Sequence, residues 1–104
     1  MRRACFVLEI RSGAEETYDR LHAEIADDVR GAIGDAGLRN YSLFRSGTTV
    51  VGYVEAEPDF ATSMALLEES SPFQSWAKGF KEVFTETRKG VARLTELEEI
   101  WHVD

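Results

Sequence analysis

The first segment of the chain, residues 4–10, divides at a period of two into an apolar face and a face with Cys5, Val7 and Glu9. Phe6, Leu8 and Ile10 share one face of this segment. The charged Glu9 lies on the other face. Because successive side chains of a β-strand point to opposite faces, this period of two predicts a strand with one buried face.

A helical period follows over residues 15–36 and predicts one continuous helix. Glu15 and Glu16 open the segment, where acidic side chains suit the positive end of the helix dipole. Gly37 follows it and is a favourable residue just past a helix C-terminus. At about 100° per residue, the apolar positions fall within an arc of roughly 120°. These positions are Tyr18, Leu21, Ile25, Val29, Ala32, Ile33 and Ala36.

A hairpin and two further helical segments are predicted next. Residues 39–45 and 48–56 are strand-like, and Ser46-Gly47 between them is a hairpin signal. Residues 58–69 form a second helical region. Pro72 then suits the first turn of a third helical segment.

The remaining elements complete a βαββαβ order. The third helical segment carries apolar residues at helical spacing, namely Phe73, Trp76, Ala77, Phe80, Val83 and Phe84. Residues 96–103 form the last predicted strand. This order is that of an α+β ferredoxin-like domain, an antiparallel sheet with helices on one face. Nothing indicates a domain boundary, so residues 1–104 are predicted to form a single domain. By analogy with this fold, two copies are expected to pair as a dimeric α/β barrel.

The charge balance is acidic. The 104 residues include 12 Lys and Arg against 19 Asp and Glu, which gives a formal net charge of −7. Binding to a phosphate backbone requires clustered cations, whereas the cations here are scattered. No segment reaches the roughly 20 apolar residues of a membrane span. The sequence therefore disfavours nucleic acid and membrane as partners and favours a small neutral ligand.

The compartment is predicted from the N-terminal segment and from Cys5. Cys5 is the only cysteine, so no internal disulfide can form, which agrees with a reducing compartment. The apolar stretch after the first three residues is interrupted by Glu9 and Arg11, too early for a secretory signal. We expect a cytoplasmic protein.

Metal, nucleotide and covalent chemistry have little support in the sequence. His22 and His102 are far apart, and no Cys/His cluster has the spacing of metal ligands. No glycine-rich loop follows a strand, and Cys5 lies mid-strand, where a buried, inert thiol is expected. We therefore expect no metal and no cofactor, which leaves acid–base chemistry.

His22 falls within the apolar arc of the first predicted helix, one turn after Tyr18. The two side chains are therefore neighbours. Two interpretations remain open. His22 is either a core histidine hydrogen-bonded to a carbonyl or to Tyr18, or a general acid–base group that faces a cavity. Histidine suits the second role because its ordinary pKa of about 6.5 makes both protonation states accessible.

Tyr41 and Trp76 are candidates for the wall of a ligand site. Tyr41 lies on the second predicted strand, where a buried hydroxyl requires a partner. Trp76 lies on the apolar stripe of the third helical segment, where core packing is the usual role. Sugars present apolar C–H faces that stack on aromatic rings. Together with Tyr18 and His22, these side chains suit a sugar, provided that all four converge.

With these residues identified, the chain resembles the L-rhamnose mutarotase family over nearly its whole length. No single motif is long, but their order and spacing are fairly specific. The motifs are Ala4-Cys5-Phe6-Val7-Leu8, Tyr18-x-x-x-His22, Asn40-Tyr41-Ser42-Leu43, Phe73-Gln74-Ser75-Trp76 and Leu97-Glu98-Glu99-Ile100-Trp101.

The resemblance implies a dimeric ferredoxin-like isomerase that interconverts the α and β anomers of L-rhamnose without a cofactor. By matching position, His22 is implied as the proton donor; the helical spacing makes Tyr18 its partner in the predicted catalytic pair. Tyr18, Tyr41 and Trp76 are implied as substrate contacts. In this mechanism His22, as imidazolium, supplies a proton to the ring oxygen, and the acceptor of the anomeric hydroxyl proton is not identified.

The chain also departs from the family pattern. Members often carry a tryptophan and a proline where this chain has Ala26 and Asp27, and a second tryptophan where it has Ala77. Ala77 removes a large ring from the substrate wall, so the substrate is L-rhamnose or a related deoxysugar. Two alternatives share the fold: a cofactor-free dimeric α/β-barrel monooxygenase, and a non-enzymatic sugar-binding module in which His22 is structural.

Overall fold

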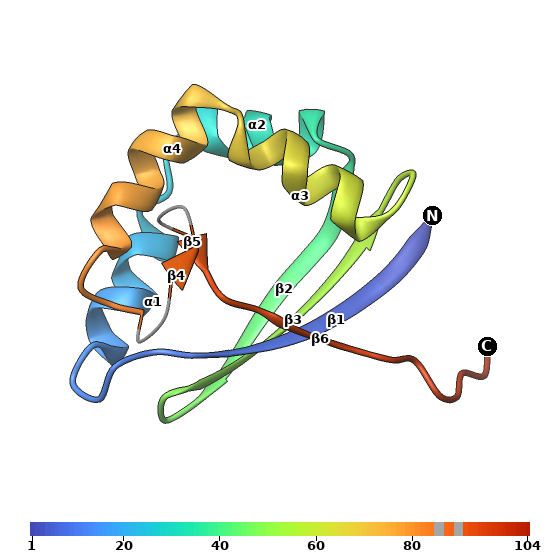
Figure 1. Cartoon of the computed structure of the whole chain (residues 1–104), viewed down its shortest axis with the longest axis horizontal. Helices are drawn as coiled ribbons and strands as arrows, with labels where there is room; N and C mark the ends of the chain where they lie inside the picture. The colour runs from blue at the N-terminus through green and yellow to red at the C-terminus, as the bar shows by residue number, and fades with distance from the viewer. Residues whose placement is uncertain (85–86, 89–90) are drawn as a thin grey trace.

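The computed structural model describes residues 1–84, 87–88 and 91–104 and has a four-stranded sheet (Figure 1). Its strands are β1 (Arg2–Glu9), β2 (Leu38–Ser46), β3 (Thr49–Ala56) and β6 (Thr95–Leu97). They lie in the order β2-β3-β1-β6, and each neighbouring pair is antiparallel. Figure 1 shows the helices arching over one face of this sheet. The ferredoxin-like α+β fold predicted from the sequence is confirmed.

The predicted alternation in β1 is also confirmed. Phe6 and Leu8 are buried on the face that the helices cover, whereas Glu9 is exposed. β3 pairs with β1 along its whole length, from Arg2↔Ala56 to Glu9↔Thr49. Gly52 of β3 lies under the Phe6 ring, and a Cβ there would come within 2.1 Å of a ring carbon. Glycine at this position lets the ring lie flat against the sheet.

The predicted single helix over residues 15–36 is wrong, because the segment forms two helices. These are α1 (Glu15–Ala23) and α2 (Asp27–Asp35), with a break at residues 24–26. Asp27 and Asp28 fill the first turn of α2, where carboxylates favour a new helix N-terminus. Gly37 follows α2 with a φ of 92°, as expected of a residue just past a helix C-terminus.

The two later helical predictions are confirmed, with changed limits. The side chain of Asp59 accepts a hydrogen bond from the Thr62 N–H and caps α3 (Phe60–Glu68). Ser70 caps α4 (Ser71–Ala77) in the same way, through the Phe73 N–H. A 3₁₀ turn, η1 (Lys78–Phe80), continues α4. None of the helices in the described part of the chain is long and apolar enough to cross a membrane.

The last predicted strand, residues 96–103, is shorter than expected. β6 spans only Thr95–Leu97, and the chain then runs without regular structure to its C-terminus. Beyond Leu97, backbone pairing with β1 gives way to a side-chain contact, in which the Arg3 guanidinium donates two hydrogen bonds to Glu99 at 3.0 and 2.8 Å. Two short strands, β4 (Thr87–Arg88) and β5 (Val91–Ala92), pair separately from the main sheet.

Candidate active site

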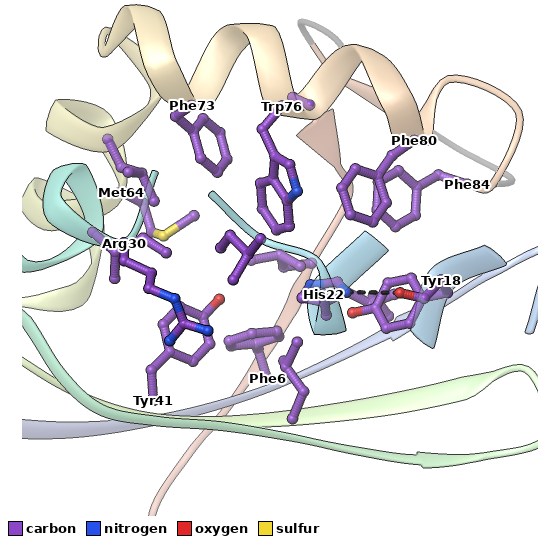
Figure 2. Close-up of a pocket in the computed structure, with 17 residues that line it drawn as sticks. Phe6, Tyr18, His22, Arg30, Tyr41, Met64, Phe73, Trp76, Phe80 and Phe84 are labelled. Atoms are coloured by element: carbon purple, nitrogen blue, oxygen red, sulfur yellow. Dashed lines mark hydrogen bonds between the residues drawn. The ribbon is translucent and has the colours of Figure 1, made fainter. Parts of the chain in front are cut away.

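A cavity of about 560 Å³ lies between the sheet and the helices. Figure 2 shows that its lower side, which we call the floor, carries Phe6, Tyr41, His22 and Tyr18. The opposite side, which we call the roof, is formed by side chains of α3, α4 and the residues after α4. The roof residues include Met64, Leu67, Phe73, Trp76, Ala77, Phe80 and Phe84. A ligand here would lie between polar groups below and apolar groups above.

His22 lies in this cavity with one nitrogen fixed. Its Nδ1 lies 2.9 Å from the backbone oxygen of Tyr18, one helical turn earlier (Figure 2). Because a carbonyl oxygen only accepts hydrogen bonds, Nδ1 carries the hydrogen and donates it. In the neutral ring Nε2 is then unprotonated, and it has no protein partner among the described residues. Nε2 is the nitrogen left free to exchange a proton with a ligand.

Aromatic rings surround His22 on several sides. The ring centroid of Tyr18 lies 4.5 Å away, that of Trp76 5.0 Å away and that of Phe80 5.2 Å away. This burial lowers the pKa of His22 from its ordinary value of 6.5, because an apolar surrounding disfavours the charged ring. The hydrogen bond to the Tyr18 carbonyl opposes part of this change. His22 is therefore neutral at pH 7 and ready to accept a proton at Nε2.

Tyr18 and Tyr41 contribute two protonated phenols to the floor. Burial raises the pKa of Tyr41 to about 12. Burial also raises the pKa of Tyr18, with a smaller contribution from the nearby Tyr41 hydroxyl. No buried side-chain oxygen or nitrogen in the described residues lacks a hydrogen-bond partner. The hydroxyls of Tyr18 and Tyr41 have no protein partner among these residues, so neither hydroxyl is fully buried. Each can therefore donate a hydrogen bond to a ligand.

A bulge in β2 turns Tyr41 toward the floor. The β2–β3 register shifts between Arg39 and Ser42, and Asn40 has a φ of 50°. The bulge adds one residue to β2. Without it, the alternation that buries Leu38 would place Tyr41 on the opposite face. With it, Tyr41 lies against Phe6, with ring centroids 6.2 Å apart. The Asn40 side chain donates a hydrogen bond to Glu55 at 2.9 Å.

Trp76 joins α4 to the end of α1. Its Nε1 donates a hydrogen bond to the Leu21 carbonyl at 3.2 Å. Leu21 lies in the last turn of α1, where backbone carbonyls have no partner within the helix.

The four candidate residues that the sequence identified all line this one cavity. They are Tyr18, His22, Tyr41 and Trp76.

Arg30 is a lining residue that the sequence did not identify. On a single helix it would lie about 120° from Tyr18, outside the apolar arc. The break at residues 24–26 separates α1 from α2, so one projection does not describe both helices. Arg30 of α2 lines the cavity at the end near Tyr41 (Figure 2).

The described residues provide no metal site and no carboxylate in this cavity. They contain no group of three or more His, Cys, Asp or Glu side chains that could hold a metal ion. No Asp or Glu is among the described residues that line the cavity. Cys5 lies on the face of β1 that points away from the helices. His102 is in the C-terminal segment, where it contacts Asp104 at 2.9 Å.

Comparisons with known proteins agree with this geometry. Residues 3–103 match the family model for L-rhamnose mutarotase. The L-rhamnose mutarotases of Opitutus terrae and Oceanobacillus iheyensis are each 28% identical to the chain, with full coverage of both sequences.

Solved structures show the same fold. The L-rhamnose mutarotase of Formosa agariphila superposes with a TM-score of 0.83 at 16% identity, with full coverage of both chains. The tetracenomycin F2 cyclase of Streptomyces glaucescens superposes with a TM-score of 0.69 at 19% identity, also with full coverage. At these identities the two structures show a shared fold alone. The match over residues 3–103 is what identifies the chain: it belongs to the L-rhamnose mutarotase family, whose members are isomerases that interconvert sugar anomers.

Proposed function

We propose that this protein interconverts the α and β anomers of L-rhamnose or a related deoxysugar, with His22 as its acid–base group and without a cofactor. The observation that carries the proposal is the free Nε2 of a neutral His22, which faces a cavity beside two protonated phenols. Family membership favours this reaction over a monooxygenase and over a sugar-binding module.

One nitrogen can perform both proton transfers of mutarotation. The anomeric oxygen and the ring oxygen are bonded to the same carbon, so both can lie within reach of Nε2. Nε2 takes the proton of the anomeric hydroxyl, and the bond between the anomeric carbon and the ring oxygen breaks. The imidazolium then returns that proton to the ring oxygen, which leaves an open-chain aldehyde and a neutral His22. Rotation of the aldehyde and the reverse steps close the ring on the other face.

The surrounding groups support this proton shuttle. The shuttle needs no second titrating residue, which agrees with a described cavity wall that carries no carboxylate. The phenols of Tyr18 and Tyr41 stay protonated, so they donate hydrogen bonds to sugar oxygens and hold the ring. Trp76 offers an aromatic face to the C–H side of the sugar. The sequence predicted that the His22 imidazolium delivers a proton to the ring oxygen. In the shuttle this delivery is the second of the two proton transfers.

Anomer exchange measured by proton NMR saturation transfer on L-rhamnose tests the proposal. General acid–base catalysis typically contributes about 10²–10⁴-fold, so His22→Ala should lose most of the acceleration. His102→Ala is the matched control, because this histidine lies in the exposed C-terminal segment. Equal exchange with wild type and His22→Ala would reject the role of His22. Oxygen uptake with an aromatic substrate would instead favour a monooxygenase.

We also propose that the protein works as a homodimer in the cytoplasm. The dimer is supported by the sheet face opposite the helices, which leaves Phe44 of β2 63% exposed and Leu97 of β6 46% exposed. Apolar patches of this kind commonly bind another protein surface. The cytoplasmic location rests on the sequence and stays a prediction.

A further inference from the structure

The two sides of the cavity differ in the hydrogen bonds that they can make. The floor offers the Nε2 of His22 and the hydroxyls of Tyr18 and Tyr41, and Arg30 adds a guanidinium at the end near Tyr41. The roof consists of phenylalanine, leucine, methionine and alanine side chains and of Trp76. Its single polar side-chain atom, the Nε1 of Trp76, already donates to the Leu21 carbonyl. A sugar hydroxyl that pointed at the roof would therefore find no partner, and burying it there would be unfavourable.

The roof carries its smallest side chain at Ala77. Phe73, Ala77 and Phe80 follow one another at helical spacing and all line the cavity. Ala77 contributes only a methyl group between two phenyl side chains and so adds the least side-chain volume to the roof; we call this position the recess. The whole cavity, at about 560 Å³, falls within the range of about 300–1,000 Å³ that holds ligands larger than one pyranose ring.

From these observations we propose that the substrate is a reducing sugar that carries an apolar substituent, and that the roof binds this substituent at Ala77. The proposal rests on the proposed mutarotase function, because it places the anomeric carbon at His22. The hydroxyls of the sugar face the floor. An alkyl, acyl or aryl group on the far side of the ring lies against Phe73, Met64 and the recess at Ala77.

The test compares L-rhamnose with 4-O-benzyl-L-rhamnose, which keeps a free anomeric hydroxyl and adds an aromatic group across the ring. Binding is measured by calorimetry and exchange by saturation transfer. Burial of one aromatic group should strengthen binding of the benzylated sugar by about 10- to 100-fold over L-rhamnose. The value of kcat/KM for anomer exchange should also be higher for the benzylated sugar than for L-rhamnose.

Ala77→Trp fills the recess. The ratio of the affinity for the benzylated sugar to that for L-rhamnose should then fall to about one or below. Ser75→Trp is the matched control, because Ser75 is exposed on the same helix and does not line the cavity, so the preference should persist. If Ala77→Trp does not fold, as judged by circular dichroism, Ala77→Leu replaces it and should reduce the preference in part.

The outcomes separate this inference from the proposed function. Normal exchange of L-rhamnose without tighter binding of the benzylated sugar would overturn the inference and leave the mutarotase function intact. Tighter binding that Ala77→Trp removes, with no exchange of either sugar, would support the apolar subsite and overturn the mutarotase function. Tighter binding that persists in Ala77→Trp would place the substituent elsewhere and overturn the inference.

Discussion

Among individual side chains, His22 shows how local contacts select one protonation state. The Tyr18 carbonyl fixes the hydrogen on Nδ1, and the surrounding rings disfavour the imidazolium. Both effects leave an unprotonated Nε2 as the resting form. The same burial that lowers the pKa of His22 raises the pKa of both phenols. One apolar environment thus prepares a base and two hydrogen-bond donors at once.

The lowered pKa of His22 predicts the pH dependence of exchange. Because the neutral ring starts the reaction, kcat/KM should be constant near neutral pH and fall as the pH drops through the folded-state pKa. The midpoint should lie below the ordinary value of 6.5, since burial lowers this pKa. Saturation transfer over a pH series, corrected for uncatalysed exchange, measures it. A midpoint above that value, or activity that rises on acidification, would contradict the neutral resting form.

The bulge at Asn40 predicts a conformational requirement at that position. A φ of 50° is strained for a β-branched residue and tolerable for asparagine or glycine. Asn40→Val should lower the free energy of unfolding by about 1–3 kcal/mol, and Tyr41 should lose its orientation. Asn40→Gly keeps the backbone and loses only the contact with Glu55, so it should cost less. Urea unfolding measures both variants, and a valine variant as stable as wild type would refute this account.

Between elements, the contact of Trp76 with α1 stabilises the site as well as lining it. Trp76→Phe keeps an aromatic ring but leaves the Leu21 carbonyl without its donor. The variant should lower the free energy of unfolding by about 1 kcal/mol. Trp101→Phe is the control, because Trp101 is 76% exposed and should change little. Equal effects of the two substitutions in thermal unfolding would show that the hydrogen bond contributes nothing.

The elements that the sequence predicted well are those with a regular period. The alternation in β1 and the hairpin at residues 46–48 depend on neighbouring residues, so the pattern contains them. The break before Asp27 was hidden because the apolar period continues across it. The bulge at Asn40 involves pairing with a distant strand, and so does the end of β6 after Leu97. Arg30 was missed for the same reason as the break, since its position depends on the direction of α2.

For the molecule as a whole, the position of the sheet separates two surfaces with different roles. The cavity lies on the side that the helices cover, and Phe44 lies on the other side. Phe44 pairs with Val51 of β3, and Val7 of β1 pairs with the same residue, so three apolar side chains cross this face. A second copy that covered this face would remove them from water without entering the cavity.

Phe44→Asp tests this separation of assembly from catalysis. A buried, unpaired carboxylate is costly, so the substitution should shift a dimer toward monomer in sedimentation experiments. Leu66→Asp is the control, because Leu66 is 51% exposed on α3 and lies on the helical side. Phe44 lies on the sheet face opposite the cavity, so a folded Phe44→Asp monomer should still exchange anomers. A monomer that folds normally but has lost exchange would show that the partner subunit contributes to the site.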